Sequence, residues 1–406
     1  MMTTFTVPDH EIEAPRFEAV SQLVQASVGE VYPAAVILIA RQGEVVYQRG
    51  FGEIDAGAGV TPRQTRFDLA SLTKLFTLTA LLRLVADGLV ELDTPVGDVL
   101  PAFRGERPIG PAEDPIAKVP LPADPQYEGQ RVRLETITLR HLLTHTSGLA
   151  AWRSVYAVGE PQRPVPMPHA VPPALRRERM AAVYHYDFAY PTGEKILYSD
   201  LGFMLLGETV ARLGGAPLDH CIRRLVCVPL ELWDSGYNPL KHGLDPAAIA
   251  PTEFCAWRER RCRGEVHDEN AAGLGGVSGH AGMFSTVADL ARLGQVYLSG
   301  GRVNDEQWLP ADLVAESVRE QVALGGSRRG LGWVLQTEQD CACGSLFGRG
   351  SFGHTGFTGT SLWIDPDRKL LVAALTNRVY YGRNPDGILA FRPRLHDAVV
   401  EALEKA

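Results

Sequence analysis

The segment that most constrains the fold is residues 71–88, SLTKLFTLTALLRLVADG. Its apolar side chains would occupy nearly every face of a helix, and Gly88 marks the end of the pattern. A helix with this composition cannot lie at a surface, because water would meet apolar side chains in most directions. We therefore predict a helix buried at the centre of the fold, covered by other elements on all sides.

The elements predicted around this helix fall into three blocks. A helical stripe at residues 17–28 precedes two strand-like runs that meet at a turn, Gln42–Gly43. The middle of the chain has helical patterns and two proline-rich stretches, which we expect to form ordered loops or lids. The last block returns to strands, with a turn at Asp365–Pro366–Asp367, and ends in a helix.

This order predicts an α+β fold, an α/β sandwich in which an antiparallel sheet is built from both chain ends and flanked by helices. We expect residues 1–85 and 285–406 to form this α/β sheet domain. Residues 86–284 would form an all-helical insertion domain with proline-rich loops. A substrate cleft is expected where the two meet.

Composition excludes several classes of function. A net charge of −8 argues against a nucleic-acid partner, and no run of eighteen apolar residues predicts a membrane span. The N-terminal stretch lacks the basic region, apolar core and cleavage site of a signal peptide. The six cysteines are too dilute for a disulfide scaffold, so we interpret them as reduced thiols of a cytoplasmic protein.

The first candidate for chemistry is the pair Ser71 and Lys74. Positions i and i+3 of a helix are neighbours, so the amine can reach the hydroxyl. A serine needs a base to become a nucleophile, and a lysine is a base only when it is neutral. We expect burial in the apolar helix to lower the pKa of Lys74. Taken alone, the spacing also occurs by chance, with Ser71 as a helix cap.

Two further motifs supply complementary groups. Tyr198, in the sequence YSD, can return a proton to a leaving group, while Ser199 or Asp200 can cap the helix that follows. The sequence His354–Thr355–Gly356–Phe357 offers donors for a substrate carbonyl or carboxylate and a glycine that permits close approach. The N–H groups of Ser71 and Phe357 could together form an oxyanion hole. A bulged strand with a buried histidine is the alternative.

The three motifs, in this order, resemble the serine β-lactamase and penicillin-binding-protein superfamily. The closer resemblance is to its class C β-lactamase-like branch, which contains D-alanyl-D-alanine peptidases, D-aminopeptidases and carboxylesterases. Phrases typical of the branch, such as LRHLLTHTSGL and GHTGFTGTSLWIDP, extend over most of the chain. The resemblance implies Ser71 as the acylated nucleophile, Lys74 with Tyr198 as the acid–base pair, and the strand motif as the substrate-binding strand.

Two positions depart from the pattern of the branch. Asp200 stands where an asparagine is usual, and a carboxylate can accept a hydrogen bond but cannot donate one. His354 replaces a lysine, and an ordinary histidine is mostly neutral at pH 7. Both changes weaken the case for β-lactam hydrolysis. A reading of Ser199–Asp200–Leu201 as a Ser-Asp-Asn motif fails, because the leucine side chain cannot form hydrogen bonds.

Other polar stretches are weaker candidates. His141 and His145 in HLLTH lack the glutamate of zinc peptidases, so we interpret them as a structural helix end. The stretch GEVHDEN, residues 264–270, is expected to be a surface loop, although it could border the cleft. Ser278 in GVSGHAG lacks the final glycine of a nucleophile elbow.

The sequence therefore predicts a serine hydrolase that cleaves small ester or amide bonds through an acyl-enzyme on Ser71, most simply of the carboxylesterase type. It would need no metal or organic cofactor. The alternatives are a β-lactamase, a D-alanyl-D-alanine carboxypeptidase or D-aminopeptidase, a sensor that is acylated without turnover, and a metal-dependent hydrolase. The sequence gives no indication of the oligomeric state.

Overall fold

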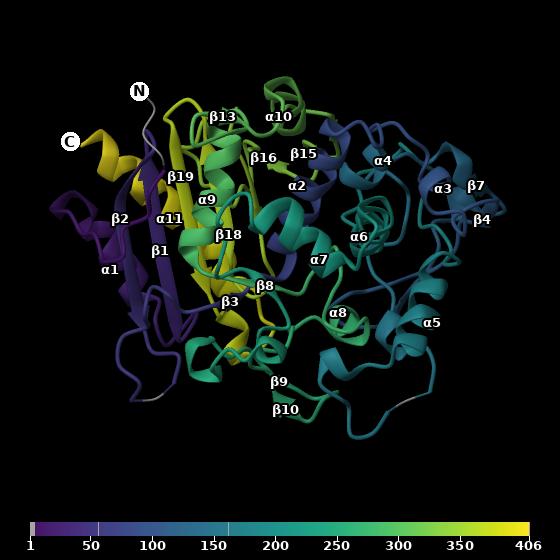
Figure 1. Ribbon diagram of the computed structural model, residues 1–406, viewed down its shortest axis with the longest axis horizontal. Coiled ribbons are helices and arrows are strands. Elements are labelled where there is room, and N and C mark those ends of the chain that lie inside the picture. Colours follow the sequence, from purple (N-terminus) through teal and green to yellow (C-terminus); the bar gives the residue numbers. More distant parts are fainter. Residues whose placement is uncertain (1–4, 56, 161, 406) are drawn as a thin grey trace.

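An eight-stranded antiparallel sheet built from both ends of the chain organises the computed structural model, which describes residues 5–55, 57–160 and 162–405 (Figure 1). N-terminal strand β1 pairs with C-terminal strand β19, which confirms the predicted construction of the sheet. In spatial order the strands are β14 (Val322–Leu324), β15 (Ser327–Arg329), β16 (Val334–Leu335), β17 (Phe352–Thr355), β18 (Ser361–Asp365), β19 (Leu370–Thr376), β1 (Ala34–Arg41) and β2 (Glu44–Gly52).

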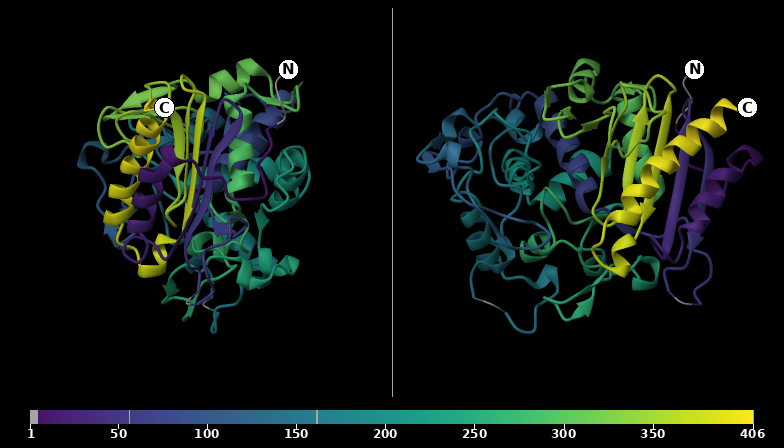
Figure 2. Two further views of the ribbon diagram at one scale, coloured as in Figure 1. Left: turned by 90° about the vertical axis from the view of Figure 1, so that its left-hand side faces the viewer. Right: turned by 180° about the vertical axis from the view of Figure 1, so that it is seen from behind.

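Helices cover both faces of this sheet, which explains why β1 is apolar and buried from its start to Ala40. Val36 and Leu38 belong to the larger core cluster, with α2 (Thr73–Ala86) and α9 (Val287–Leu298). Ile37 and Ile39 point to the opposite face, where they pack with the N-terminal and C-terminal helices. These are α1 (Glu18–Ala26) and α11 (Asp386–Glu404), which lie side by side against the sheet in Figure 2.

The remaining elements lie mostly in the middle of the chain, as the helical patterns predicted. The helices there are α3 (Val96–Val99), α4 (Leu139–Leu143), α5 (Pro173–Val183), α6 (Asp200–Gly214), α7 (Leu218–Ile222) and α8 (Glu269–Gly273), and α10 (Ala311–Val318) follows α9. Short strands accompany them: β4 (Glu106–Pro108) with β7 (Arg131–Arg133), β5 (Ala112–Glu113) with β6 (Pro120–Leu121), β9 (Phe254–Cys255) with β10 (Arg260–Arg261), and β12 (Arg302–Val303) with β13 (Glu306–Gln307). Because short strands such as β4 and β9 lie within residues 86–284, this segment is mostly helical and not entirely so. The division at residues 85 and 285 stays a prediction.

A small sheet ties this middle segment to the entrance of α2. Strand β11 (Met283–Ser285) pairs with β3 (Phe67–Asp68) on one side and with β8 (Gly236–Tyr237) on the other. Helix α2 itself is buried along nearly its whole length and packs against α6. Gly88 follows its end with φ +72°, a conformation that favours glycine. The predicted central helix is thus confirmed.

The predictions on cellular location rest on the N-terminus, on the absence of a membrane span and on the cysteines. Residues 1–4, part of the stretch without signal-peptide features, lie outside the described residues. None of the helices in the described ranges is both long enough and apolar enough to cross a bilayer. All six cysteines are buried and free of disulfides.

Candidate active site

Ser71 lies on a short turn that is held in a strained conformation. It belongs to a 3-10 turn, Ala70–Leu72, that leads directly into α2. Ala70 has φ +46°, which is unfavourable for any residue with a Cβ. The Asp68 carboxylate stabilises this turn by accepting a hydrogen bond from the Ala70 N–H at 2.8 Å. The result is a partly exposed serine at the N-terminal entrance of a buried helix.

Lys74 lies one turn further along and is fully buried. Its Nζ donates to Ser71 Oγ at 3.1 Å, to Asp200 Oδ1 at 2.7 Å and to the His280 carbonyl at 3.1 Å. Burial lowers the pKa of Lys74, but the Asp200 carboxylate more than offsets this, and the net pKa is raised. The expectation of a neutral lysine is therefore wrong for the resting protein, because Asp200 holds it as an ammonium ion.

Tyr198 completes a cluster of three side chains. The Lys74 Nζ lies 4.8 Å from the centre of its ring. The buried hydroxyl of Tyr198 lies near Ser71 and Lys74 but forms no hydrogen bond of good geometry with a described residue. Burial raises the pKa of Tyr198, and the Lys74 ammonium opposes that rise. Ser199 caps α6 by accepting from the Gly202 N–H at 3.2 Å, so the capping role proposed for this turn is present too.

Strand β17 provides the opposite wall of the site. His354 is buried, and its Nδ1 lies 2.9 Å from the Thr355 carbonyl. Burial, together with the charges of Lys74 and Arg329, lowers the pKa of His354 to about 3. The predicted neutral histidine thus follows from its surroundings, and His354 provides no cation for a substrate.

The turn after β17 lies against the strand that carries Asp68. Thr358 Oγ1 donates to the Asp68 carbonyl at 2.7 Å, and Thr360 Oγ1 donates to the Leu69 carbonyl at 3.0 Å. Among the described residues, the N–H groups of Ser71 and Phe357 have no hydrogen-bond acceptor. Two free donors on segments tied together in this way fit the expected oxyanion hole.

Arg329 is a candidate that the sequence reasoning missed. It lies on β15, and its guanidinium carbon is 5.7 Å from the centre of the Tyr198 ring. It forms no ion pair with any described carboxylate, and burial lowers its pKa. A partly buried guanidinium without a carboxylate partner has the chemistry to bind an anionic group. The two arginines in SRRG give no signal of this in the sequence.

His145 also has a larger role than a helix end. It follows α4, with φ +58°, and its Nδ1 accepts from the Ser199 N–H at 3.0 Å. Its ring packs on that of Tyr198 with centroids 4.6 Å apart. His141, by contrast, takes part in the capping box at the start of α4 with Thr138. His145 therefore fixes the position of Tyr198.

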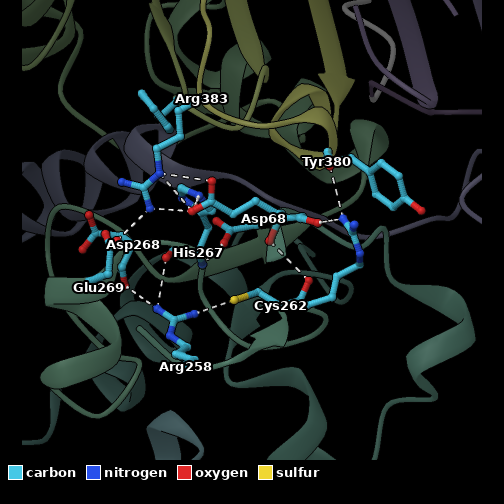
Figure 3. Close-up of polar contacts among 12 residues, drawn as sticks. Asp68, Arg258, Cys262, His267, Asp268, Glu269, Tyr380 and Arg383 are labelled. Atoms are coloured by element: carbon cyan, nitrogen blue, oxygen red, sulfur yellow. Dashed lines mark hydrogen bonds and ion pairs between the residues drawn. The ribbon is translucent and has the colours of Figure 1, made fainter. Parts of the chain in front are cut away.

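The stretch GEVHDEN is largely buried, so the expectation of a surface loop is wrong. Figure 3 shows the polar contacts that surround His267, Asp268 and Glu269. The glutamates of the stretch are paired with arginines: Glu269 with Arg383 at 2.7 Å and Glu265 with Arg260 at 2.7 Å. His267 Nε2 lies 3.1 Å from Glu253 Oε1. The backbone N–H of His267 also donates to the Asp68 carboxylate at 2.6 Å. The charged sequence concealed this burial because one of the neutralising arginines, Arg383, comes from a distant segment. The loop supports the turn that carries Ser71.

Ser278 and His280 belong to the same supporting layer. Ser278 Oγ lies 2.8 Å from His280 Nδ1, and His280 Nε2 lies 2.9 Å from Asp268 Oδ1. Both residues are buried, so Ser278 is no nucleophile for a substrate in solution. The His280 carbonyl is one of the three acceptors of Lys74. Among the described residues, no group of three or more histidine, cysteine or acidic side chains could hold a metal ion.

The sheet flanked by helices, with a serine, a lysine and a tyrosine meeting at one end of a buried helix, defines the class as β-lactamase-like serine hydrolases. A family model described as Beta-lactamase matches residues 20–391, so the chain belongs to this family.

The relatives carry different names. A Bacillus subtilis protein named "N-acetylmuramyl-L-alanine amidase" is 29% identical over 400 residues, covering 91% of this chain and 82% of the relative. An Escherichia coli K12 protein named "Putative D-alanyl-D-alanine carboxypeptidase" is 30% identical over 393 residues, covering 89% and 82%. The structure of EstCE1, described as a hydrolase with promiscuous acyltransferase activity, has a TM-score of 0.66 at 22% identity and covers 93% of this chain and 98% of its own. This last likeness concerns the fold alone.

Proposed function

We propose that this protein cleaves amide or ester bonds through an acyl-enzyme on Ser71. The observation that carries the proposal is the 3.1 Å contact between Ser71 Oγ and Lys74 Nζ beside the Tyr198 ring. Once Lys74 has lost a proton, its amine accepts the Ser71 proton as Oγ attacks the substrate carbonyl. The N–H groups of Ser71 and Phe357 hold the oxyanion.

Tyr198 completes the cycle. Its hydroxyl lies in the cluster with a free hydrogen-bonding capacity, so it can pass the proton from Lys74 to the leaving group. Water then attacks the acyl-enzyme, with the same two groups taking its proton and returning it to Ser71 Oγ.

We propose further that the preferred substrates carry a carboxylate near the scissile bond, as an acyl-D-alanyl-D-alanine peptide does. The support is Arg329, a guanidinium beside the site that has no carboxylate partner among the described residues. His354 is neutral and leaves this role to Arg329. The names of the two curated relatives, an amidase and a carboxypeptidase, agree with an amide substrate that has an acidic group.

A carboxylesterase of the type expected from the sequence is the second candidate. The neutral His354 favours it, because an uncharged ester needs no cation in the site. The two candidates differ in their dependence on Arg329. A carboxylate substrate should lose affinity when the guanidinium is removed, whereas a neutral ester should not.

The experiment compares diacetyl-L-lysyl-D-alanyl-D-alanine with p-nitrophenyl butyrate on the wild type and on Arg329→Met. We expect kcat/KM for the peptide to fall about 100-fold or more in the variant, as loss of a charge-assisted pair predicts, with the ester changed less than threefold. Wild-type turnover of the ester alone would support the second candidate. Labelling of Ser71 by a penicillin without turnover of either substrate would indicate a sensor.

A further inference from the structure

Arg392 is a buried cation on α11 that forms no ion pair with a described carboxylate. Only 6% of the residue is exposed. Its Nη2 donates to two backbone carbonyls, those of Gly356 at 2.8 Å and Thr360 at 2.9 Å. Its Nε has no partner among the described residues. Burial, and secondarily the charge of Arg378, lowers the pKa of Arg392 to about 9. Such an arrangement is costly, so it calls for a compensating role.

The first of these carbonyls belongs to a particular peptide group. The Gly356 C=O and the Phe357 N–H are the two ends of one planar amide. A guanidinium that binds the oxygen draws electrons from the nitrogen, which makes the N–H a stronger donor at its other end. The Phe357 N–H has no acceptor in the described part of the chain, and it is the donor assigned above to the oxyanion.

The geometry around this peptide is fixed from several sides. The Phe357 carbonyl accepts from Arg378 Nε at 2.9 Å, and the Gly356 N–H donates to the Thr360 carbonyl at 2.7 Å. Arg392 contacts both carbonyls at the base of this tight turn and therefore sets its width. A change of a few tenths of an ångström here would redirect the Phe357 N–H, and an oxyanion hole is sensitive to that direction.

We propose that Arg392 is a positioning residue that orients and polarises the Gly356–Phe357 peptide so that its N–H stabilises the oxyanion formed at Ser71. The inference deepens the proposed function and rests on it. Arg392 acts through the backbone and does not contact the substrate. Its loss should therefore affect the transition state and spare binding of the ground state.

The test uses Arg392→Met, Arg392→Lys and a matched control, Arg179→Met. Arg179 is also 6% exposed and donates to two backbone carbonyls, those of Val158 and Gly273, in another part of the fold. Three quantities are measured with p-nitrophenyl butyrate as substrate: kcat, KM, and the inhibition constant of phenylboronic acid. The boronate is tetrahedral and anionic on Ser71, so it reports on the oxyanion hole directly. Thermal unfolding reports on stability.

We expect Arg392→Met to lower kcat about tenfold and to weaken phenylboronic acid by a similar factor, part of what loss of a whole donor costs, with KM changed less than twofold. Arg392→Lys retains the positive charge and one donor nitrogen, so its losses of kcat and boronate affinity should be smaller than those of Arg392→Met. Arg179→Met should lower the unfolding temperature without changing the ratio of inhibition constant to KM.

The inference is overturned if Arg392→Met keeps the wild-type kcat and boronate affinity, or if it loses them no more than Arg179→Met does. It is also overturned if kcat falls while the boronate binds as tightly as before. If Arg392→Met does not fold, Arg392→Lys alone decides: an unchanged boronate constant contradicts the inference. An inactive wild type that no serine reagent labels would instead contradict the proposed function itself.

Discussion

Lys74 Nζ lies closer to Asp200 Oδ1, at 2.7 Å, than to Ser71 Oγ, at 3.1 Å. The proposed base is thus held first by a carboxylate and only second by the nucleophile that it has to deprotonate. This ion pair is buried on the lysine side and raises the pKa of Lys74. Asp200 therefore raises the pH at which Lys74 would become a neutral base.

Replacement of Asp200 by asparagine should move activity to lower pH. A carboxylate at this distance typically raises the pKa of its partner by about 1–3 units, so its removal lowers the pKa of Lys74. The neutral amine then exists at lower pH, and the acidic limb of kcat/KM should shift down by at least about one unit. The pH profile of p-nitrophenyl butyrate hydrolysis checks this. Asp219→Asn, at a partly buried aspartate of α7, serves as control. An unshifted or raised limb in Asp200→Asn would contradict the role of the pair.

Tyr198→Phe should lower kcat, whereas Ser199→Ala should lower mainly the stability of the fold. Loss of the phenol removes the proton relay and should lower kcat by about 10²–10⁴, with the fold intact. Loss of the Ser199 hydroxyl removes the cap of α6, which costs about 1 kcal/mol of stability and only a small part of kcat. Steady-state kinetics and thermal unfolding of both variants separate the two. The reverse pattern would place the functional hydroxyl on Ser199.

Gly356→Ala should inactivate the protein. A Cβ on Gly356 would lie 2.1 Å from Thr360 Oγ1 and 2.5 Å from the Leu69 carbonyl, so the turn after β17 would have to move away from the Ser71 segment. Overpacking of this kind costs about 1–3 kcal/mol, and the displaced Phe357 N–H should lower kcat further. Gly350→Ala is the matched control, since its Cβ would meet nothing within 4 Å. Equal activity of the two variants would show that the close contact of Gly356 with the Leu69 carbonyl is not needed for activity.

His354 should make stability depend on pH. Burial lowers its pKa to about 3 in the folded protein, whereas the pKa in the unfolded chain is about 6.5. Between these two pH values the unfolded chain binds a proton that the folded protein does not. Stability is therefore complete above about pH 6.5 and is lost as the pH falls towards 3. Between pH 7 and pH 4 this histidine alone should remove about 3 kcal/mol of the free energy of unfolding.

Unfolding titrations with guanidinium chloride at pH 7 and pH 4, on the wild type and on His354→Asn, measure this loss of stability. The difference between the two pH values should be smaller in the variant by roughly that amount. The exposed His169→Asn is the control and should behave as the wild type does. A variant that loses as much stability as the wild type would show that His354 takes no part.

Much of this architecture could be predicted because its signals are local. The apolar segment 71–88 could only be a buried helix, and the turn at Gln42–Gly43 could only join adjacent strands. The order of three motifs indicated Ser71, Lys74 and Tyr198. Distances between them could not be read from the chain, since 124 positions separate Lys74 from Tyr198.

What the sequence concealed depends on long-range pairing. The charged loop around His267 is buried with the help of Arg383, which pairs with Glu269 from a distant segment, and of Arg258, which lies nine positions before His267. Likewise, Arg329 and Arg392 are ordinary arginines in the sequence, and their lack of carboxylate partners among the described residues is visible only in three dimensions. The raised pKa of Lys74 also required the distance to Asp200.

The central claim, that Ser71 is the acylated nucleophile, is tested most directly by intact-mass spectrometry after incubation with a fluorophosphonate. The wild type should gain the mass of a single adduct, and Ser71→Ala should gain none. An adduct of equal yield on Ser71→Ala, or an unlabelled but folded wild type, would contradict the account.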